Sequence, residues 1–411
     1  AIKWLGARPE LRLDEAMASA IMTAWREEPG DVLAFLPGVG EIERTRERLV
    51  QQLPQVPVLP LHGQCEPAAQ RAAIRRDPDG RRRIVLATAI AETSLTLDGV
   101  SVVVDAGLSR RAEFDKAAGV TRLVTHRASQ AAAAQRAGRA ARQGPGIAYR
   151  LWEEAAHPGR PPFEPPEILT SDLAPLLLTL AQWGAGDVAG MAWLDVPPPA
   201  ALAAARRTLE GLGALDGDGL ITPHGRNMAK LPMEPGLAHM LLYAAERGAA
   251  EEGACLALLL QERGLGGRGE DLALRLDRWD GDRSPRAEAS RKLAAGWEKR
   301  ARALVSRQTQ ERPPLAVLLA EAFPESIAKR RDAAGEDWLT AGGRGLRLDP
   351  TSPLARAEWL AVGDAQGEAK GARITGGIAL TEQLVKFVCD ALAMGVKVGQ
   401  KVAGVAVAQG E

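Results

Sequence analysis

Four short apolar runs alternate with helix-forming segments over the first hundred residues, and this alternation constrains the fold more than any other feature. The runs predict strands and span Val32–Leu36, Val58–Leu61, Ile84–Thr88 and Val100–Asp105. Helices are predicted before and between them, over Leu13–Glu28, Gly40–Leu53 and Pro67–Arg76. Strands that alternate with helices of this length are typical of a parallel sheet covered on both faces, whose ligands bind beyond the carboxyl ends of the strands. We therefore predict an α/β lobe over residues 1–156.

The strongest chemical signal is a glutamine followed by three arginines. Ser129 has the features of a helix N-cap and residues 144–146, Gly-Pro-Gly, form a stop, so the segment between them is predicted to be a helix. On such a helix Arg139 and Arg142 share a face one turn apart, and Gln135 lies one turn before Arg139. Two guanidiniums on one face suit a triphosphate whose charge grows in the transition state. Taken alone, a basic helix of this kind is more often a solvated surface.

A segment rich in short hydroxyl side chains follows the third predicted strand. Its threonines and serine, together with its backbone amides, can donate hydrogen bonds to phosphate oxygens. The hydroxyl residues are Thr88, Thr93, Ser94 and Thr96. Taken alone, this segment is also compatible with an ordinary connection between a strand and a helix.

The overall charge does not indicate a polyanionic partner, because lysine plus arginine equals aspartate plus glutamate at 52 each. Residues 110–150 are an exception, with nine cationic against two acidic residues. Cys65, Cys255 and Cys389 lack metal-ligand spacing and fit a reducing cytosol, so no metal site is predicted. We find no signal peptide and no apolar run long enough to span a bilayer, and we expect a cytoplasmic protein without a membrane partner.

Three of these segments together resemble the second RecA-like lobe of superfamily-2 helicases of the DEAH/RHA group. The strand end Phe35–Gly38, the segment 87–99 and the glutamine–arginine run 135–142 each match a motif of that group. The sequence is most similar to the bacterial HrpB type of ATP-dependent helicase. Ala141 stands where the third motif has a glycine, and Ala89 where the second has an asparagine. The first change is harmless on a helix, whereas the second removes one polar contact to the strand.

The resemblance implies roles for individual residues. Arg139 and Arg142 would be arginine fingers that reach the γ-phosphate of ATP, and Gln135 would lie near that phosphate and its attacking water. Thr96 and Asp98 would line the nucleotide side of the site. The residues that would contact the sugar-phosphate backbone are Thr88, Thr93, Ser94, Arg110 and Arg111. Residues 110–125 alternate polar and apolar side chains and predict a β-hairpin, which in the resembled family lies against the displaced strand. A purely solvated ribbon fits the same pattern.

The composition changes after residue 156, and here the resemblance implies a series of smaller domains. These are a proline-rich connector (157–166), a winged-helix-like domain (167–234), a ratchet-like helical bundle (235–332), a small β-barrel of oligonucleotide-binding type (333–374) and an unassigned tail (375–411). The helices predicted in this part span 173–184, 200–212, 222–230, 237–247, 251–260, 284–308 and 380–394, with a loop at 264–283. Trp338 or Trp359 could stack on bases in the barrel, although core packing is the commoner role.

One half of a helicase active site is missing from these 411 residues. An ATPase of this kind needs a Gly-Lys-Ser/Thr loop for the phosphates and an acidic box for magnesium, and neither occurs in the sequence. We interpret the chain as the C-terminal portion of an ATP-dependent nucleic-acid helicase, with RNA favoured over DNA, that is inactive alone. ATP and Mg²⁺ would be bound mainly by an N-terminal RecA-like lobe, which is the expected partner. The alternative is a non-catalytic nucleic-acid-binding or regulatory module.

Overall fold

A computed structural model describes residues 1–393 except 64, 66, 93–96, 116–119, 186–187, 189, 263 and 368–370, with the backbone alone for 115, 120–122 and 389–393. The chain divides into two compact units, residues 1–112 with 123–166 and residues 113–122 with 167–411. We call them the α/β unit and the helix–barrel unit. In the part of the chain that is described, no helix has the length and apolar character needed to cross a membrane.

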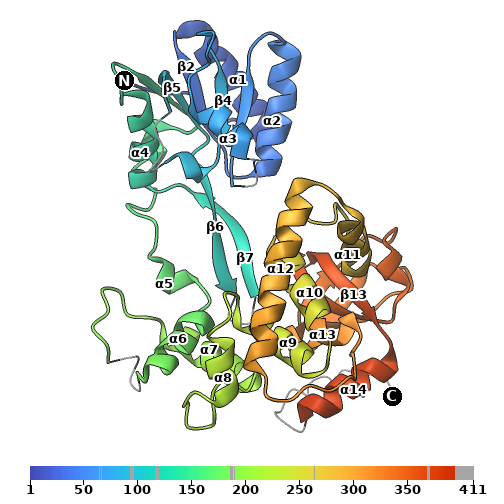
Figure 1. The fold of residues 1–411 in the computed structure, drawn as a ribbon. Helices are drawn as coiled ribbons and strands as arrows, with labels where there is room; N and C mark the ends of the chain where they lie inside the picture. The colour runs from blue at the N-terminus through green and yellow to red at the C-terminus, as the bar shows by residue number, and fades with distance from the viewer. Residues whose placement is uncertain are drawn as a thin grey trace. The chain divides into compact units, whose positions relative to one another are not determined.

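A six-stranded parallel sheet forms the centre of the α/β unit (Figure 1). Its strands, in spatial order, are β1 (Ile2–Trp4), β8 (Ile147–Arg150), β5 (Val100–Asp105), β2 (Asp31–Phe35), β4 (Ile84–Ala87) and β3 (Val58–Leu61). This sheet confirms the predicted α/β lobe. The strands β1 and β8 were not predicted, since each is short and β1 carries a lysine between its two apolar residues.

Four helices cover the two faces of the sheet, and the alternation of side chains along β2 shows how. Val32 and Ala34 pack on the face covered by α1 (Leu13–Glu27) and α2 (Val39–Gln52). Leu33 and Phe35 pack on the opposite face, in the cluster that includes residues of α3 (Pro67–Ile74) and α4 (Gln130–Ala140). Because both faces are buried, residues 32–35 of β2 are all apolar, rather than every second one.

The predicted hairpin is present as the two strands β6 (Leu108–Asp115) and β7 (Val120–Arg127), which lie side by side and extend away from the sheet (Figure 1). The Nε of Arg110 donates to the Thr125 hydroxyl across the pair at 3.0 Å. Two short 3-10 turns, η1 (Ala89–Ala91) and η2 (Glu154–Ala156), complete the unit.

The first part of the helix–barrel unit contains α5 (Glu167–Thr170), α6 (Ala174–Trp183), α7 (Pro199–Gly211) and α8 (Pro223–Met228). Leu215 and Ile221 form an isolated antiparallel bridge between α7 and α8. Thr222 caps α8, because its hydroxyl accepts a hydrogen bond from the amide of Gly225 at 2.9 Å. The helices α6, α7 and α8 agree with the predicted ones to within about two residues at their ends, where helix boundaries are least well defined.

The next five helices form a bundle: α9 (Pro235–Glu246), α10 (Ala250–Gln261), α11 (Leu272–Gly281), α12 (Pro285–Leu304) and α13 (Leu315–Ala322). The sequence-based prediction of a loop over 264–283 was wrong in its second half, where α11 lies. Asp271 caps α11 by accepting from the amides of Ala273 and Leu274, and Leu272 and Trp279 bury its apolar side. The helix α13 was not predicted, because two prolines and a run of polar residues precede it.

A closed five-stranded barrel follows, as the resemblance implied. Its strands are β9 (Ile327–Arg330), β10 (Asp337–Thr340), β11 (Gly345–Arg347), β12 (Trp359–Gln366) and β13 (Ala372–Leu380), with the turns η3 (Pro324–Ser326) and η4 (Pro353–Arg356). The barrel therefore takes in residues on both sides of the predicted limits 333 and 374. Trp338 and Trp359 are both buried, and the indole N–H of Trp338 donates to the Gly335 carbonyl at 2.8 Å. The helix α14 (Glu382–Ala393) comes last.

Candidate nucleotide and nucleic-acid site

The helix α4 carries the glutamine–arginine run and lies against one face of the sheet. Ser129 caps it as predicted, since its hydroxyl accepts a hydrogen bond from the amide of Ala132 at 3.1 Å. The next two amides, of Gln130 and Ala131, donate to the carbonyls of Pro161 and Pro162 in the proline-rich connector. The first three backbone amides of α4 therefore donate to acceptors that lie outside the helix. Alanines face the sheet, so α4 can approach it closely.

Arg136 is the first arginine of the run and is buried, with 1% of its surface exposed. Its Nη1 donates to the Asp105 carboxylate at 2.8 Å and to the Leu108 carbonyl at 3.0 Å. Its Nε donates to the Glu92 carboxylate at 2.7 Å. Burial raises the pKa of Glu92, and the charge of Arg136 opposes that rise. The cluster thus joins α4 to the carboxyl end of β5 and to the segment that follows β4.

Arg139 is held against the same segment. Its Nε donates to the Glu92 carbonyl at 3.1 Å, and its Nη2 donates to the same oxygen. Burial lowers the pKa of Arg139, and the neighbouring charge of Arg142 lowers it further. The two predicted arginine fingers are therefore close enough to repel one another, which favours an anion between or beside them.

Arg142 follows the end of α4 and is exposed. Within the described residues it makes no hydrogen bond or ion pair. Gln135 is also exposed, as is Gly138 between them on the helix, and a Cβ at Gly138 would meet nothing within 4 Å. Gln135 is therefore exposed on α4 and Arg142 is exposed just past its end, whereas the buried Arg139 is bonded to the Glu92 carbonyl. Sequence spacing alone had grouped Gln135 with Arg139.

The segment 88–99 joins the carboxyl end of β4 to the amino end of β5. Thr88 is half-buried directly after β4, and its amide donates to the Leu61 carbonyl at 3.2 Å. Asp98 lies at the other end, ahead of β5, and its carboxylate accepts from Nε2 of Gln143 at 2.9 Å. The predicted contacts Thr93, Ser94 and Thr96 lie outside the described residues. The candidate residues that the structure describes here, Thr88 and Asp98, therefore lie at opposite ends of the strands and do not gather at the carboxyl edge, where we expected ligands to bind.

The two hairpin arginines already have carboxylate partners. The Nη2 of Arg110 lies 3.3 Å from Oε1 of Glu41, at the start of α2. Arg111 forms an ion pair with Glu164 of the connector, and the same Glu164 accepts from the amide of Ser129 at 3.0 Å. Each guanidinium would have to exchange or share these partners in order to bind a phosphate.

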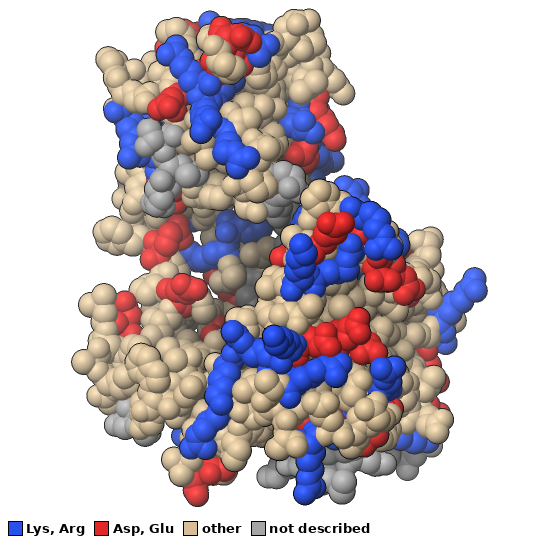
Figure 2. Space-filling model, viewed as in Figure 1, with Lys and Arg blue, Asp and Glu red and all other residues tan. Residues whose placement is uncertain are grey.

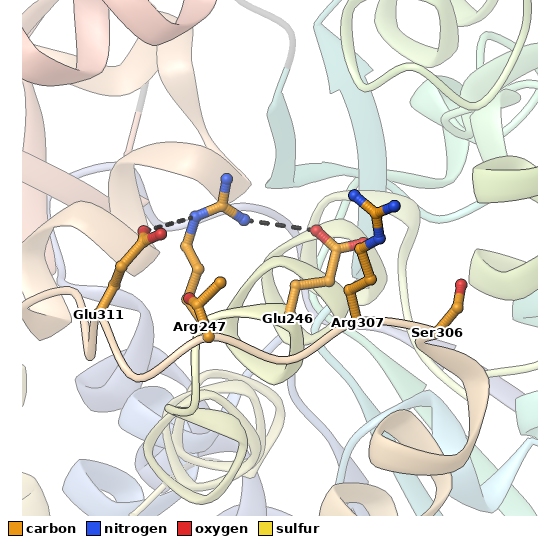
Figure 3. A pocket seen from close by; sticks show the side chains of 6 residues that line it. Glu246, Arg247, Ser306, Arg307 and Glu311 are labelled. Carbon is orange, nitrogen blue, oxygen red and sulfur yellow. Dashed lines mark hydrogen bonds and ion pairs between the residues drawn. The ribbon is translucent and has the colours of Figure 1, made fainter.

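The helix–barrel unit offers a second surface of interest, a cavity of about 320 Å³ beside the end of α9 (Figure 3). Arg247 lies there with its Nη1 3.4 Å from Glu246 and its Nε 3.5 Å from Glu311. Both flanking carboxylates compensate its charge, so the cavity does not favour an anion. On the face drawn in Figure 2, lysine and arginine alternate with aspartate and glutamate over much of this unit.

No group of three or more metal-ligating side chains occurs among the residues that the structure describes. Cys65 and Cys255 are free thiols. The burial of Trp338 and Trp359 supports the core-packing role for both.

Sequence reasoning did not identify the cluster of Glu92, Asp105 and Arg136. Arg136 had been counted only in the local excess of positive charge, yet it is the most buried arginine of the run. Its partners lie 31 and 44 residues away in the chain. The available signals were an acidic residue that ends an apolar strand and a second one inside the hydroxyl-rich segment.

Comparison with known proteins supports the fold and the resemblance. Residues 13–144 match the helicase conserved C-terminal domain. The chain is 42% identical over 355 residues to the ATP-dependent RNA helicase HrpB of Escherichia coli, covering 85% of this chain and 42% of that protein. A crystal structure of the Escherichia coli DEAH/RHA helicase HrpB superimposes with a TM-score of 0.82 at 37% identity, covering 93% of this chain and 48% of that one. The chain corresponds to the C-terminal part of an HrpB-type helicase of the DEAH/RHA group.

A eukaryotic relative shares the same region. The pre-mRNA-splicing factor ATP-dependent RNA helicase prp22 of Schizosaccharomyces pombe is 39% identical over 248 residues, which is 58% of this chain and 21% of that protein. The chain spans less than half the length of both curated relatives.

Proposed function

We propose that this chain supplies the arginine-bearing half of the ATP-hydrolysing site of an ATP-dependent RNA helicase. The observation that carries the proposal is the exposed Arg142, which has no partner among the described residues and stands beside Arg139. An uncompensated guanidinium next to a second one suits the γ-phosphate of a nucleotide held by another lobe. The names of both curated relatives, each an ATP-dependent RNA helicase, support ATP and RNA as the ligands.

The residues of this chain would act by electrostatics and positioning. Arg142 would donate to the γ-phosphate oxygens, and the planar fork of its guanidinium would follow the charge as it moves onto them. Arg139 would add positive potential while its Nε and Nη2 stay on the Glu92 carbonyl. The exposed Gln135 would orient the attacking water. ATP with Mg²⁺, bound mainly by an N-terminal RecA-like lobe, would supply the scissile bond and the metal charge.

The nucleic acid would contact the segment 88–99 and the hairpin through phosphates. Thr88 donates a hydroxyl at the carboxyl end of β4, and Arg110 and Arg111 stand on β6. Contacts to phosphates position a strand without reading its sequence, so such a site would accept many RNA sequences. We expect the chain alone to hydrolyse no ATP, because it lacks a Gly-Lys-Ser/Thr loop.

The test is Arg142→Ala in the ATP-hydrolysing protein that contains this chain. Removal of an arginine finger is expected to lower the hydrolysis rate by roughly three to five powers of ten, with folding unchanged because the side chain is exposed. Arg26→Ala, at an exposed position on α1, is the matched control and should hydrolyse normally. Turnover of Arg142→Ala within a few-fold of wild type would refute the assigned role. RNA binding without any stimulated hydrolysis in the wild type would instead favour the non-catalytic module.

A further inference from the structure

We infer that Gln143 is a positioning residue, whose side chain fixes Arg142 to the end of the segment 88–99 and so links that segment to the arginine. The inference concerns the site proposed above and rests on that function for its catalytic consequence. Its structural part, a hydrogen-bonded bridge, stands without it.

Gln143 makes two hydrogen bonds with consecutive residues. Its Nε2 donates to Oδ1 of Asp98 at 2.9 Å, and its Oε1 accepts from the amide of Gly99 at 2.9 Å. The carboxamide thus uses both of its ends on one short stretch of chain, which determines its orientation as well as its position. The contact spans 44 residues of sequence.

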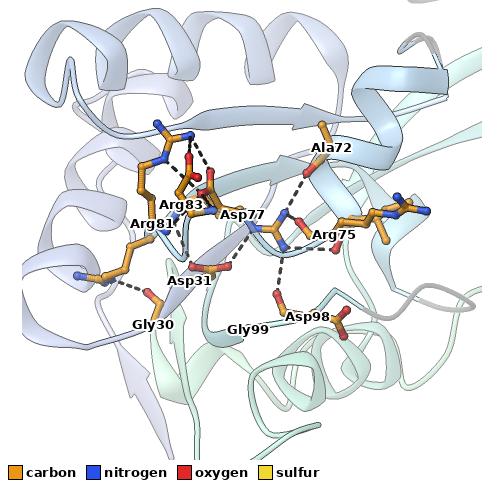
Figure 4. A network of polar contacts seen from close by, with 12 residues as sticks. Gly30, Asp31, Ala72, Arg75, Asp77, Arg81, Arg83, Asp98 and Gly99 are labelled. Atoms are coloured by element: carbon orange, nitrogen blue, oxygen red, sulfur yellow. Dashed lines mark hydrogen bonds and ion pairs between the residues drawn. The ribbon is translucent and has the colours of Figure 1, made fainter.

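The stretch that Gln143 reaches is itself held in place from the other side (Figure 4). The buried Arg83 donates from Nη2 to the Asp98 carbonyl at 3.0 Å and from Nε to the Asp31 carboxylate at 2.9 Å. It also donates to the carbonyls of Ala72, Ile74 and Arg75 around the end of α3. Gly99 has φ +84, and a Cβ there would lie 3.1 Å from the Asp31 carboxylate. Asp98 and Gly99 therefore have a defined position, set by Arg83 and by Gln143.

Among the residues that the structure describes, Arg142 has no other such support. The helix α4 ends at Ala140, and the amide of Ala141 makes the last bond of the helix, to the Gly138 carbonyl at 3.2 Å. Residues 142–145 are exposed. The chain then passes close under α4, since a Cβ at Gly146 would lie 2.0 Å from the Ala140 carbonyl oxygen. Between the end of α4 and Gly146, the side chain of Gln143 makes the hydrogen bonds that hold the chain in the described structure.

These hydrogen bonds connect Asp98 and Gly99 directly to the residue that follows Arg142. A shift of Asp98 and Gly99, such as a bound strand could cause along the same segment, would move the backbone next to Arg142. A misplacement of about 1 Å can slow a reaction by roughly a hundredfold. Loss of Gln143 should therefore weaken the coupling of strand binding to hydrolysis more than it weakens ATP binding.

The structural part can be tested on the 411-residue chain by hydrogen exchange at the Gly99 amide. Gln143→Ala should accelerate exchange there by about tenfold, because the amide loses its acceptor. Gln52→Ala, at the exposed end of α2, is the control and should leave the rate unchanged. Equal protection of Gly99 in wild type and Gln143→Ala would overturn the bridge.

The catalytic part uses the ATP-hydrolysing protein that contains the chain. In Gln143→Ala we expect RNA-stimulated kcat to fall about tenfold, with KM for ATP within twofold of wild type. Asp98→Ala should cause a similar loss, and the double variant should lose little more, as expected for two ends of one bond.

The two proposals fail in different ways. If the wild type shows no RNA-stimulated hydrolysis, the proposed function fails. The hydrogen bonds of Gln143 to Asp98 and Gly99 are then tested only by hydrogen exchange at the Gly99 amide. If the wild type is stimulated but Gln143→Ala retains its full kcat and stimulation, the positioning role of Gln143 fails while the proposed function stands.

Discussion

The two units of this chain stabilise their interiors in different ways. The core of the α/β unit contains charged side chains, among them Arg83, Asp31, Arg136 and Asp105, each less than 10% exposed. In the described part of the bundle α9–α13, the buried residues are mainly leucine and alanine, and Glu321 is the buried charged one. The ion pair of Arg302 with Glu298 in that bundle lies on the surface.

Buried charges and buried apolar side chains contribute differently to a fold. A buried ion pair adds little net stability compared with well-packed apolar groups, because both charges lose their hydration. It does specify geometry, since each guanidinium must meet particular carboxylates and carbonyls. In the α/β unit these specified positions are the segment 88–99 and α4, which carry the candidate site. The bundle needs only packing, and its leucines supply that without directional bonds.

The largest effect on stability is expected from Arg136→Ala. The change leaves Asp105 and Glu92 buried without their partner, and breaking such a pair costs about 3–5 kcal/mol. Hydrogen exchange of the β5 amides in increasing urea measures this for the α/β unit separately. The control Arg26→Ala should change it by less than about 0.5 kcal/mol. If Arg136→Ala lowered the free energy of unfolding by less than about 1 kcal/mol, the contrast between the units would fail, because the buried carboxylates would then not need Arg136 for their stability.

The bundle should respond to lost volume instead. Leu318 of α13 is fully buried, and Leu318→Ala is expected to cost about 2–5 kcal/mol through the removed methyl groups and the cavity left behind. Leu274→Ala on α11, where the side chain is 46% exposed, is the matched control and should cost well under 1 kcal/mol. Exchange of the α9 and α13 amides provides the measurement. A similar cost at both leucines would contradict an interior maintained by packing.

A histidine pair gives the helix–barrel unit a strong expected dependence on pH. Nε2 of His224 lies 2.9 Å from Nδ1 of His239, whose Nε2 is 3.5 Å from the Glu321 carboxylate. Burial, together with the charge of His239, lowers the pKa of His224 to about 4. Above pH about 6.5 the imidazole is neutral in both the folded and the unfolded chain. As the pH falls from there to 4, the unfolded chain takes up a proton that the folded chain refuses, so stability decreases by about 2–3 kcal/mol.

The measurement is the free energy of unfolding of the helix–barrel unit between pH 7 and 4, compared in wild type and His224→Gln. The variant keeps a hydrogen-bonding side chain but cannot titrate. The comparison is needed because burial raises the pKa of Asp172 and Glu234 in the same unit. These two carboxyls increase the stability as the pH falls, whereas His224 decreases it. Identical pH profiles for the two proteins would show that His224 titrates normally in the fold.

The same contrast explains what could be predicted from the sequence. The central strands of the α/β unit, the Ser129 cap and the hairpin followed from local patterns, and Val58–Leu61 and Val100–Asp105 were placed to the residue. The three-residue strand β1 could not be predicted, because it is a strand only through its pairing with β8. Helix α11 was taken for a loop, since its aspartates and arginines hide an apolar side that only the bundle reveals.

The candidate site was predictable in its motifs and not in its geometry. The spacing of the arginines identified the run, and the resemblance assigned Arg139 and Arg142. That Arg136 would be buried, and that Asp98 would pair with Gln143, depended on contacts that span 31 and 45 residues of chain. Such pairings are decided by tertiary placement, for which no local pattern exists. The functions of Gln135, Arg139, Arg142, Thr88 and Asp98 stay predictions that the experiments above address.

The smallest effect is expected from Arg302→Ala on the surface of α12. Nη2 of Arg302 lies 2.8 Å from the Glu298 carboxylate one turn earlier, and the arginine side chain is 45% exposed. An exposed pair of this spacing contributes about 0.3–0.5 kcal/mol, which added salt should reduce further. The free energy of unfolding of the bundle at low and high salt measures both. Arg302→Ala and Arg136→Ala remove the same side chain from two helices, but Arg136 is buried between two carboxylates and Arg302 is exposed beside one. A cost at Arg302 near that at Arg136 would mean that the charge itself, and not its burial, determines stability, and the distinction between the two units would no longer hold.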